Sequence, residues 1–450
     1  MTPRLLKEAW TVAIEALSWM ELEEMSERSA LSKTVKQLSI QNTEVVGLAH
    51  RLVYETIRRK NLIDHTANAA LAPRSLKDFR LGVRAFLRLY IYQTKFLNGD
   101  FDEAASMASM GRSILGWREL QGVEEALGKI LSIKPEHVLE GADDEEKVAL
   151  TTWHPPWFVD YCFQLLGRRE ALRFLESSMA TLPTYIRINT LRGSEETLLR
   201  RLKKDGVRLK EIQELKHAHK VIESSKSLVR TKSYRDGCFY IQDLASCLAV
   251  EAADPQPGMT VLDICAAPGA KTIHLAQLME NEGVVYSVDY SRRRMRIWKR
   301  ETRRMGVEIA VPIICDACRP LPLRVSADLV LLDPPCTSTG VFSRMPSAKW
   351  RLTEASMTEM SSFQWRMLNE CVRHVKDGGI LVYSTCSIAV EENEMLIQKL
   401  LKHHPEFKLV EATPKLGVSG LRGLAKCQRL YPHIHDCNGF FVAKLLREAS

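Results

Sequence analysis

The chain has 450 residues, 45% of them hydrophobic and 26% charged, which is the composition of a globular protein and not of a disordered one. This length predicts two or three domains. The formal net charge of +8 mildly favours a polyanionic partner, although many basic proteins bind none.

Eleven cysteines, an odd number scattered singly along the chain, predict free thiols in a reducing, cytoplasmic compartment. Cys315 and Cys318 have a zinc-like spacing, but no second pair completes four ligands, so we expect no metal site. The first residues mix charges into an amphipathic pattern unlike a signal peptide, and no apolar run reaches membrane-spanning length. We therefore expect a monomer without a membrane association.

Residues 1–148 are predicted to be entirely helical. Leu48, Leu52, Val53 and Ile57 recur at helical spacing and share one face. The basic cluster that follows, Arg58–Lys60, is either an RNA contact or a solvated helix face.

Residues 149–238 have a different pattern and predict a small α+β domain. Pro155–Pro156 mark a break and then the start of a helix. The segments "TYIRINTLRG" and "GCFYIQD" are typical of strands, and "SEETLLRRLKKDG" is typical of a helix that Gly206 ends.

Residues 239–450 alternate short apolar strands with helices, which predicts a doubly wound, mainly parallel, Rossmann-like sheet. We expect helices to separate the first six strands and the last two to form an antiparallel edge. The seven predicted strands lie at 260–265, 284–289, 311–315, 327–333, 380–386, 407–412 and 439–446.

The first of these strands ends in the small-residue loop "DICAAPGAKT", which leads into a helix near Lys271. Small residues let a ligand approach the backbone and the helix N-terminus. The loop is neither G-x-G-x-x-G nor a P-loop, so phosphate binding is a poor interpretation. It is either a ligand-binding loop or a tight packing turn.

Three successive strands end in aspartates, namely Asp289, Asp316 and Asp333. A single aspartate after a strand is usually a cap or turn residue. Three at the carboxyl edge of a parallel sheet, where ligands bind in such folds, indicate a site, and Asp289 suits the hydroxyls of a ribose.

Two cysteines follow strands at the same predicted edge: Cys336 in "DPPCTSTG" and Cys386 in "YSTCS". The two prolines make a rigid loop that can hold a flat ring and present Asp333 to it. A buried structural cysteine is the alternative for each thiol. For Cys386, with polar neighbours at the sheet edge, we predict a nucleophile.

Together, "CAAPGAKT", "DPPCTSTG" and "YSTCS" resemble the RNA cytosine-5 methyltransferases of the NOL1/NOP2/Sun family, which use S-adenosylmethionine. The chain is similar to the Fmu/Sun branch, because "VYETIRRKNLIDHTANAAL" resembles a NusB-like helical core and "YIRINTL" an RRM-like unit. The resemblance implies an all-α NusB-like RNA-binding domain over 1–148, a small α+β RRM-like unit over 149–238 and a methyltransferase domain over 239–450. It also implies methylation of RNA, with ribosomal RNA favoured and transfer RNA as the alternative.

The resemblance implies a role for each matching residue. Asp289 would bind the ribose with support from Arg294, and Asp316 would lie by the adenine. Asp333 would border the cofactor and face the cytosine. Cys386 would attack carbon 6 of the base, Cys336 would release the product, and Lys271 would be within reach of the base. The loop residues that would hold the methionine and ribose moieties are Cys265, Ala266, Ala267, Pro268, Gly269, Ala270 and Lys271.

One departure is Ala270, where the family usually has glycine and where a methyl group would crowd a close ligand. Because the target base must leave its stack, we expect single-stranded RNA or a flipped nucleotide as substrate. Candidate grips for it are Phe342, Arg344, Lys349, Trp350 and Arg351, unless that segment is a solvated loop with one packed tryptophan.

Two other functions compete with this interpretation. An amino-group methyltransferase would have an aromatic residue after Asp-Pro-Pro, where this chain has Cys336. A non-catalytic RNA-binding or antitermination-like protein would not need the three aspartates and both thiols.

Overall fold

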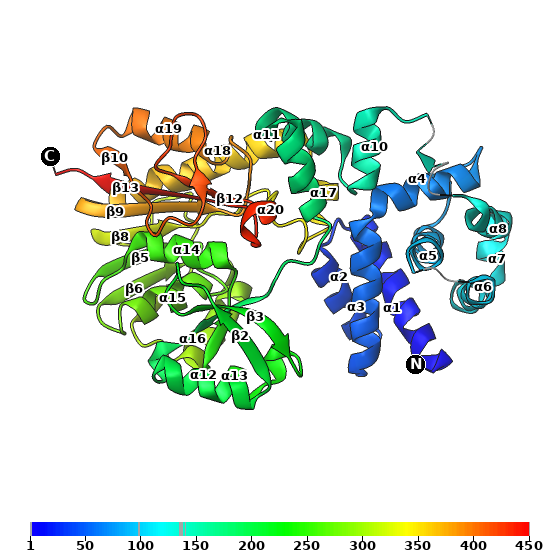
Figure 1. The fold of residues 1–450 in the computed structure, drawn as a ribbon, viewed down its shortest axis with the longest axis horizontal. Coiled ribbons are helices and arrows are strands. Elements are labelled where there is room, and N and C mark those ends of the chain that lie inside the picture. Colours follow the sequence, from blue (N-terminus) through cyan, green and yellow to red (C-terminus); the bar gives the residue numbers. More distant parts are fainter. Residues whose placement is uncertain (1, 98–99, 135–137, 140, 450) are drawn as a thin grey trace. The chain divides into compact units, whose positions relative to one another are not determined.

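The computed structural model describes residues 2–97, 100–134, 138–139 and 141–449 (Figure 1). The chain forms two compact units. The first consists of Met1–Ala180 and Phe342–Leu352, and the second of Thr181–Val341 and Thr353–Ser450. The three domain ranges given above remain predictions.

The first unit is helical, as the sequence predicts. Side chains of Thr2, Ser26, Asn42 and Asp100 accept backbone N–H groups at the starts of four helices, where those groups have no helical partner. The helices are α1 (Pro3–Leu22), α2 (Glu27–Gln37), α3 (Thr43–Arg58), α4 (Lys60–Leu71), α5 (Leu81–Ile91), α6 (Phe101–Leu115), α7 (Trp117–Leu120), α8 (Glu124–Ser132), α10 (Asp144–Thr151), α11 (Pro156–Ser177) and α17 (Ala348–Arg351).

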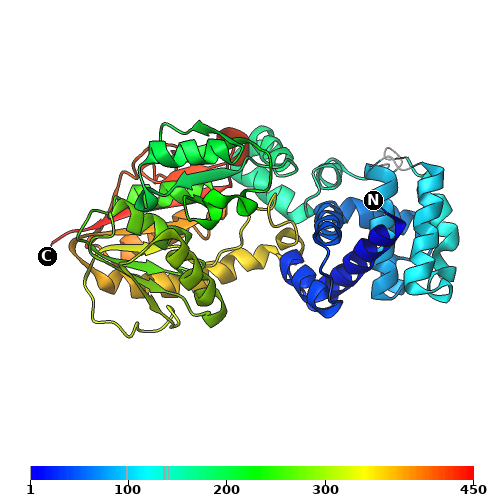
Figure 2. The same cartoon turned by 90° about the horizontal axis from the view of Figure 1, so that it is seen from below.

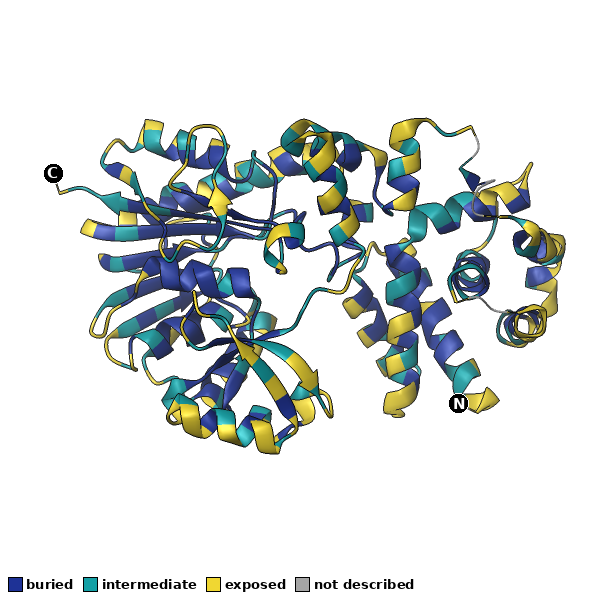
Figure 3. Cartoon of the chain, viewed as in Figure 1, coloured by how far each residue is buried: buried dark blue, intermediate teal, exposed yellow. Residues whose placement is uncertain are grey.

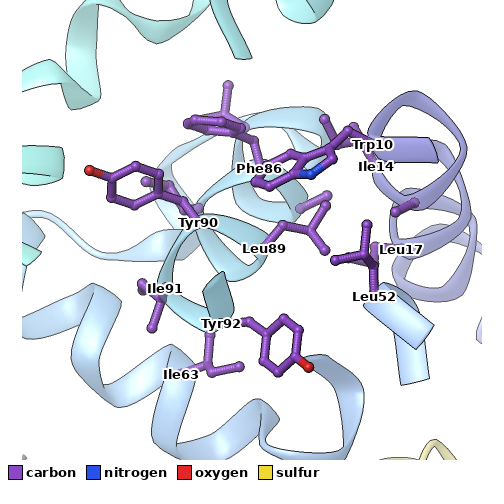
Figure 4. Close-up of a cluster of buried hydrophobic side chains, with 14 of the residues drawn as sticks. Trp10, Ile14, Leu17, Leu52, Ile63, Phe86, Leu89, Tyr90, Ile91 and Tyr92 are labelled. Atoms are coloured by element: carbon purple, nitrogen blue, oxygen red, sulfur yellow. The ribbon is translucent and has the colours of Figure 1, made fainter. Parts of the chain in front are cut away.

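Aromatic side chains from α1 and α5 form the centre of this helical core (Figure 4). The ring of Phe86 lies 6.1 Å from that of Trp10 and 5.9 Å from that of Tyr90, centroid to centroid. Gly111 on α6 faces the same ring, and a Cβ atom there would fall 2.4 Å from a carbon of Phe86. A glycine is therefore required for α6 to approach α5 this closely.

The segment Phe342–Leu352 belongs to the helical unit although it lies between strands of the other unit in sequence. Trp350 donates its indole N–H to the carbonyl of Ile57 at 2.6 Å, and the Arg58 guanidinium donates to the carbonyl of Ser343 at 3.0 Å. Phe342 and Lys349 are each only 2% exposed. The prediction that these two residues grip RNA is therefore wrong, because the helical core has buried them.

The basic cluster Arg58–Lys60 is also structural. Arg58 and Arg59 both pair with Glu55, at 3.2 and 2.5 Å, and Lys60 pairs with Asp64 at 2.9 Å. Only 7% of Arg58 is exposed. Each of these cations has an ion-pair partner within the unit, which weakens the case for an RNA contact based on their charge.

The second unit contains two sheets. The smaller sheet is antiparallel, with strand order β2-β3-β1-β4. In sequence, α12 lies between β1 and β2, and α13 lies between β3 and β4. The strands of the unit are β1 (Tyr185–Ile188), β2 (Val207–Glu211), β3 (Ala218–Ser224), β4 (Phe239–Ile241), β5 (Thr260–Ile264), β6 (Val284–Val288), β7 (Ala310–Ile313), β8 (Ala327–Leu332), β9 (Val375–Thr385), β10 (Phe407–Val410), β11 (Val418–Ser419), β12 (Gln428–Leu430) and β13 (Phe440–Arg447). Its helices are α12 (Glu195–Lys204), α13 (Lys232–Arg235), α14 (Leu244–Ala253), α15 (Ala270–Leu278), α16 (Arg292–Met305), α18 (Glu354–Cys371), α19 (Glu394–His403) and α20 (Pro432–His435).

The larger sheet has the order β11-β12-β13-β9-β8-β5-β6-β7, with β10 paired to β13. Its central strands are parallel, and β13 runs antiparallel to β9, as expected for the last strands. The sheet has nine strands and not the predicted seven, because the segment after β10 adds the short strands β11 and β12. No helix separates β7 from β8, so the expected alternation fails there.

Helices cover both faces of the larger sheet, as in a doubly wound fold (Figures 1 and 2). Successive residues of β8 point to opposite faces: Leu329 and Leu331 pack with α14 and α15, and Val330 and Leu332 with α18 and α19. Figure 3 shows the resulting buried strands. Among the described helices, none is both long and apolar enough to cross a membrane.

Candidate active site

The small-residue loop leaves β5 and turns sharply into α15. Cys265 has φ of 67° and Gly269 φ of 116°, and a Cβ atom on Gly269 would come within 3.2 Å of the Trp298 ring. Gly269 is therefore required by both its backbone conformation and its contact. Ala270 is the first residue of α15, where a helical backbone suits alanine.

Asp289 holds this loop in place. One carboxylate oxygen accepts the backbone N–H of Ala267 at 3.2 Å and the other accepts that of Ser291 at 2.9 Å. Arg294 links the same two segments, since it pairs with Asp289 at 3.3 Å and donates to the carbonyl of Ala267. The predicted ribose-binding residue is thus also the anchor of the predicted cofactor loop.

A pocket of about 270 Å³ opens beside Asp289. Its lining is mostly apolar, and Asp316 stands at its margin with a side chain that is 49% exposed. The lining residues are Cys265, Val288, Asp289, Tyr290, Cys315, Asp316, Ala317, Phe363 and Met367. This pocket brings together three of the predicted cofactor residues and is wide enough for a flat ring.

Behind the loop, a buried hydrogen-bonded chain supports α15. Thr272 donates to Asp263 at 2.5 Å and accepts the indole N–H of Trp298 at 3.0 Å. Burial raises the pKa of Asp263 to about 7. This chain fixes the start of the helix that carries Lys271.

The two cysteines predicted to act on a base are neighbours, with their sulfur atoms 3.2 Å apart. The hydrogen bond from Cys336 lowers the pKa of Cys386, and Ser338, 3.6 Å from the same sulfur, lowers it further, while burial opposes both. The same hydrogen bond, together with burial, raises the pKa of Cys336. The two pKa shifts run in opposite directions and make Cys386 the more acidic thiol of the pair.

Asp333 lies between the thiols and the cofactor loop. Its carboxylate accepts from the Lys271 ammonium at 2.7 Å and from the Ser384 hydroxyl at 2.9 Å. Burial alone would lower the pKa of Lys271, but Asp333 outweighs it, and the pKa is raised. Lys271 is therefore a charged donor at the centre of the site.

Glu392 joins the two cysteine-bearing loops, and the sequence did not reveal it. Its fully buried carboxylate accepts the backbone N–H of Thr337 at 2.9 Å, the hydroxyl of Ser387 at 2.6 Å and the amide of Gln364 at 2.8 Å. Thr337 and Ser387 directly follow Cys336 and Cys386. A glutamate in a polar loop segment gives no periodic signal, so only the topology exposes this link.

A larger hollow of about 770 Å³ lies elsewhere on this unit and is lined by acidic residues that include Glu195, Glu251 and Glu280. None of the predicted catalytic or cofactor residues lines it. The predicted site residues instead lie at the carboxyl ends of β5, β6, β8 and β9, where Asp289 borders the smaller pocket and Asp333 pairs with Lys271 of the helix after β5.

Three family models match the chain: the 16S rRNA methyltransferase RsmB/F over residues 250–446, the NusB family over 7–109, and the RsmF/B-like ferredoxin-like domain over 154–224. The RRM-like unit expected from the sequence corresponds to this ferredoxin-like domain.

Relatives agree with these matches. A probable ribosomal RNA small subunit methyltransferase B of Bacillus subtilis is 29% identical over 97% of this chain and 98% of its own length. The 25S rRNA (cytosine-C(5))-methyltransferase nop2 of Schizosaccharomyces pombe is 36% identical over 63% of this chain, which spans about half (49%) of that relative. The protein PH0851, known from a crystal structure, is 30% identical in sequence to this chain. The match covers 100% of this chain and 99% of that protein's chain, with a TM-score of 0.84. The chain therefore belongs to the RsmB/F group of RNA cytosine-C5 methyltransferases in the NOL1/NOP2/Sun family.

Proposed function

We propose that this enzyme transfers a methyl group from S-adenosylmethionine to carbon 5 of a cytosine in ribosomal RNA, through a covalent bond between Cys386 and carbon 6. The observation that carries the proposal is the pair of sulfur atoms 3.2 Å apart beside the Lys271–Asp333 ion pair. An amino-group methyltransferase has no need of two thiols, and a non-catalytic protein has no need of a lowered cysteine pKa.

The residues present fit S-adenosylmethionine. Asp289 borders the pocket and would accept from ribose hydroxyls through the lone pairs that its two backbone partners leave. The apolar pocket, which Phe363 and Met367 help to line, suits an adenine ring. Gly269 allows the loop to pack against Trp298 and turn into α15. When bound, this cofactor supplies an electrophilic methyl group on a sulfonium.

Cytosine carbon 5 is a weak nucleophile until the aromatic ring is broken. The Cys386 thiolate would add to carbon 6, forming the S–C6 bond and moving electron density to carbon 5 and nitrogen 3. The Lys271–Asp333 pair would supply a proton to nitrogen 3 and so stabilise the charge that develops there. Carbon 5 would then form its bond to the methyl group, while the bond from that methyl group to the sulfonium sulfur breaks and a neutral thioether leaves.

Product release needs the carbon 5 proton removed and the S–C6 bond broken. In the adduct Cys386 carries no charge and no longer accepts from Cys336, so the main cause of the raised Cys336 pKa is gone. Cys336 would then lose its proton to water and take the one from carbon 5. The electron pair would reform the C5–C6 double bond, expel Cys386 as a thiolate and return the nitrogen 3 proton to Asp333.

Ribosomal RNA is favoured because the relative matched over nearly its full length is named for small-subunit ribosomal RNA. The tRNA (cytosine(72)-C(5))-methyltransferase of Pyrococcus horikoshii is 36% identical, but over only 49% of this chain. Bisulfite mapping of 5-methylcytosine in ribosomal and transfer RNA, with and without the gene, tests this substrate. Loss of a methylated site confined to transfer RNA would overturn it.

The covalent step is tested with three variants and radiolabelled S-adenosylmethionine on denaturing gels. Cys386→Ala should neither form an RNA adduct nor transfer methyl groups. Cys336→Ala should accumulate a protein–RNA adduct that survives denaturation, because the bond forms but is not released. Cys318→Ala, a half-buried cysteine outside the thiol pair, is the matched control and should turn over normally. Full turnover by Cys386→Ala would disprove the nucleophile assignment.

A further inference from the structure

The helix α16 carries a concentration of positive charge that the active site does not use. Eight of its 14 residues are arginine or lysine, and its single acidic residue is the buried Glu301. Glu301 is engaged by Arg300 at 3.1 Å and by Arg304 at 2.9 Å. Besides Ile297, the exposed residues of the helix are all cations: Arg292, Arg293, Arg296, Lys299, Arg300 and Arg303.

This charge is not explained by folding. Among the residues that the structure describes, no carboxylate forms an ion pair with Arg292, Arg293, Arg296, Lys299 or Arg303. Like charges three and four positions apart repel, and three arginines in the first turn oppose the positive end of the helix dipole. Burial of the apolar face holds the helix in place despite this repulsion. A bound polyanion would relieve it.

The exposed cations also form a regular line. Arg292, Arg296, Lys299 and Arg303 follow the spacing i, i+4, i+7 and i+11, so they lie along one side of the helix. At 1.5 Å per residue the line is roughly 16 Å long. A nucleic-acid duplex carries about one negative charge per 1.7 Å of its axis, so phosphates are available along this whole length.

The line connects the cofactor pocket with the ferredoxin-like part of the same unit. At its start, Arg294 pairs with Asp289 beside the pocket. At its end, Arg192 donates to the carbonyls of Arg303 and Arg304, at 3.1 and 2.8 Å, and Arg304 donates to the carbonyl of Tyr234 on α13. Figure 1 shows α12, α13 and α16 grouped together. The neighbouring helices add the exposed cations Arg200, Lys203, Lys204, Lys232 and Arg235.

We propose that the outer face of α16 binds the phosphate backbone of a double-helical segment of the substrate RNA, away from the target cytosine. This proposal rests on RNA being the substrate. The face presents arginines to phosphates, whereas the binding of single strands needs aromatic platforms. The helix α16 exposes no aromatic side chain, and the exposed Tyr290 that precedes it lines the cofactor pocket. Duplex RNA is the polyanion that fits such a face, and the contact would be independent of sequence.

The test uses the full-length triple variant Arg296→Gln, Lys299→Gln and Arg303→Gln. Binding to a blunt RNA duplex of mixed sequence is measured over a series of salt concentrations. The slope of log affinity against log salt should fall by about 2 to 3, since each lost phosphate contact contributes about 0.9. The affinity for S-adenosylmethionine and kcat at saturating RNA should not change, whereas KM for an RNA with flanking helices should rise.

Two matched variants complete the experiment. Arg296→Lys with Arg303→Lys keeps the charge and should keep the slope. Lys402→Gln, Lys415→Gln and Lys426→Gln together remove the same charge from other exposed positions of this unit, and should leave the slope nearly unchanged. A slope unchanged in the α16 triple variant, or an equal loss in the control triple, would overturn the proposal. So would an α16 triple variant that keeps its RNA affinity but loses affinity for polyglutamate, since the partner would then be an acidic protein. Duplex binding needs no methyl transfer. A failure of the proposed methylation would therefore not change the salt dependence of duplex binding, and the two proposals can fail independently.

Discussion

Lys349 gives the sharpest test of how the segment Phe342–Leu352 is built into the helical unit. It is 2% exposed, and burial, with further contributions from Arg58 and Arg59, lowers its pKa well below the usual 10.5. The ammonium form is disfavoured because burial removes it from water and because Arg58 and Arg59 repel it. Among the described residues, no carboxylate forms an ion pair with Lys349. We predict that replacing it by methionine, which keeps the length but not the amine, removes a pH-dependent penalty on folding.

The sign and size of the effect follow from proton linkage. Where the pH lies between the lowered pKa in the fold and 10.5 in the unfolded chain, the unfolded chain holds one more proton. The free energy of unfolding therefore rises with pH by about 1.4 kcal/mol per pH unit from this group alone. The penalty is fully present below the lowered pKa and vanishes as the pH approaches 10.5. Lys349→Met should lack this slope and be the more stable variant at the lower pH.

Urea unfolding at several pH values, followed by tryptophan fluorescence, measures this difference. Six of the eight tryptophans belong to the helical unit, so the signal reports mainly on it. The quantity to compare is the pH slope of the wild type minus that of Lys349→Met, which cancels every other titrating group. The exposed Lys36→Met serves as the control for loss of a lysine in the same unit. Identical slopes in wild type and Lys349→Met would refute the argument, because Lys349 would then be charged in the folded protein.

Three further predictions concern the second unit. Glu392→Gln should leave a buried donor unpaired, at a cost of about 1–3 kcal/mol in the free energy of unfolding. It should also lower kcat at least tenfold, while calorimetry shows unchanged S-adenosylmethionine binding. A normal kcat would contradict the positioning role of Glu392. Gly269→Ala should strain the loop by about 1–2 kcal/mol and weaken cofactor binding, whereas Ala270→Gly should change that affinity little, and equal affinities for the two variants would contradict the loop geometry. Arg429 is 1% exposed and donates to Glu394 at 2.6 Å. Glu394→Gln should therefore leave an uncompensated buried charge and lower the free energy of urea unfolding by about 3–5 kcal/mol. A loss below about 1 kcal/mol would show that water reaches the pair.

The parallel part of the fold could be predicted because its strands are short apolar runs separated by helices, and burial on both faces requires that pattern. The strands β11 and β12 could not, since they have two and three residues and lack an apolar run. The absence of a helix between β7 and β8 could not be predicted either. Residues 314–326 contain several turn-forming residues and form no helix. The alternation of strands and helices elsewhere in the domain does not indicate that one crossover lacks a helix.

The site was predictable where one residue type at a strand end carries the chemistry. Asp289, Asp333, Cys336 and Cys386 lie at the sheet edge because parallel strands bring their carboxyl ends together. Glu392 was not predictable, because its role depends on two loops meeting around a single carboxylate. The role of the cations at Arg58–Lys60 could not be predicted for a related reason: a sequence shows charge but not the carboxylate, here Glu55 or Asp64, that pairs with it.

The two units cannot be separated by cutting the chain at their boundary. A fragment that begins at Thr181 would still carry Phe342–Leu352, and Phe342 and Trp350 would lose the helical core that packs around them. This segment begins six residues after Cys336, so we expect its loss of support to affect the loop that carries Cys336. We therefore expect removal of the helical unit to disturb the segment that follows Cys336, whether or not that unit binds RNA. Activity lost on its removal is not by itself evidence that it binds the substrate.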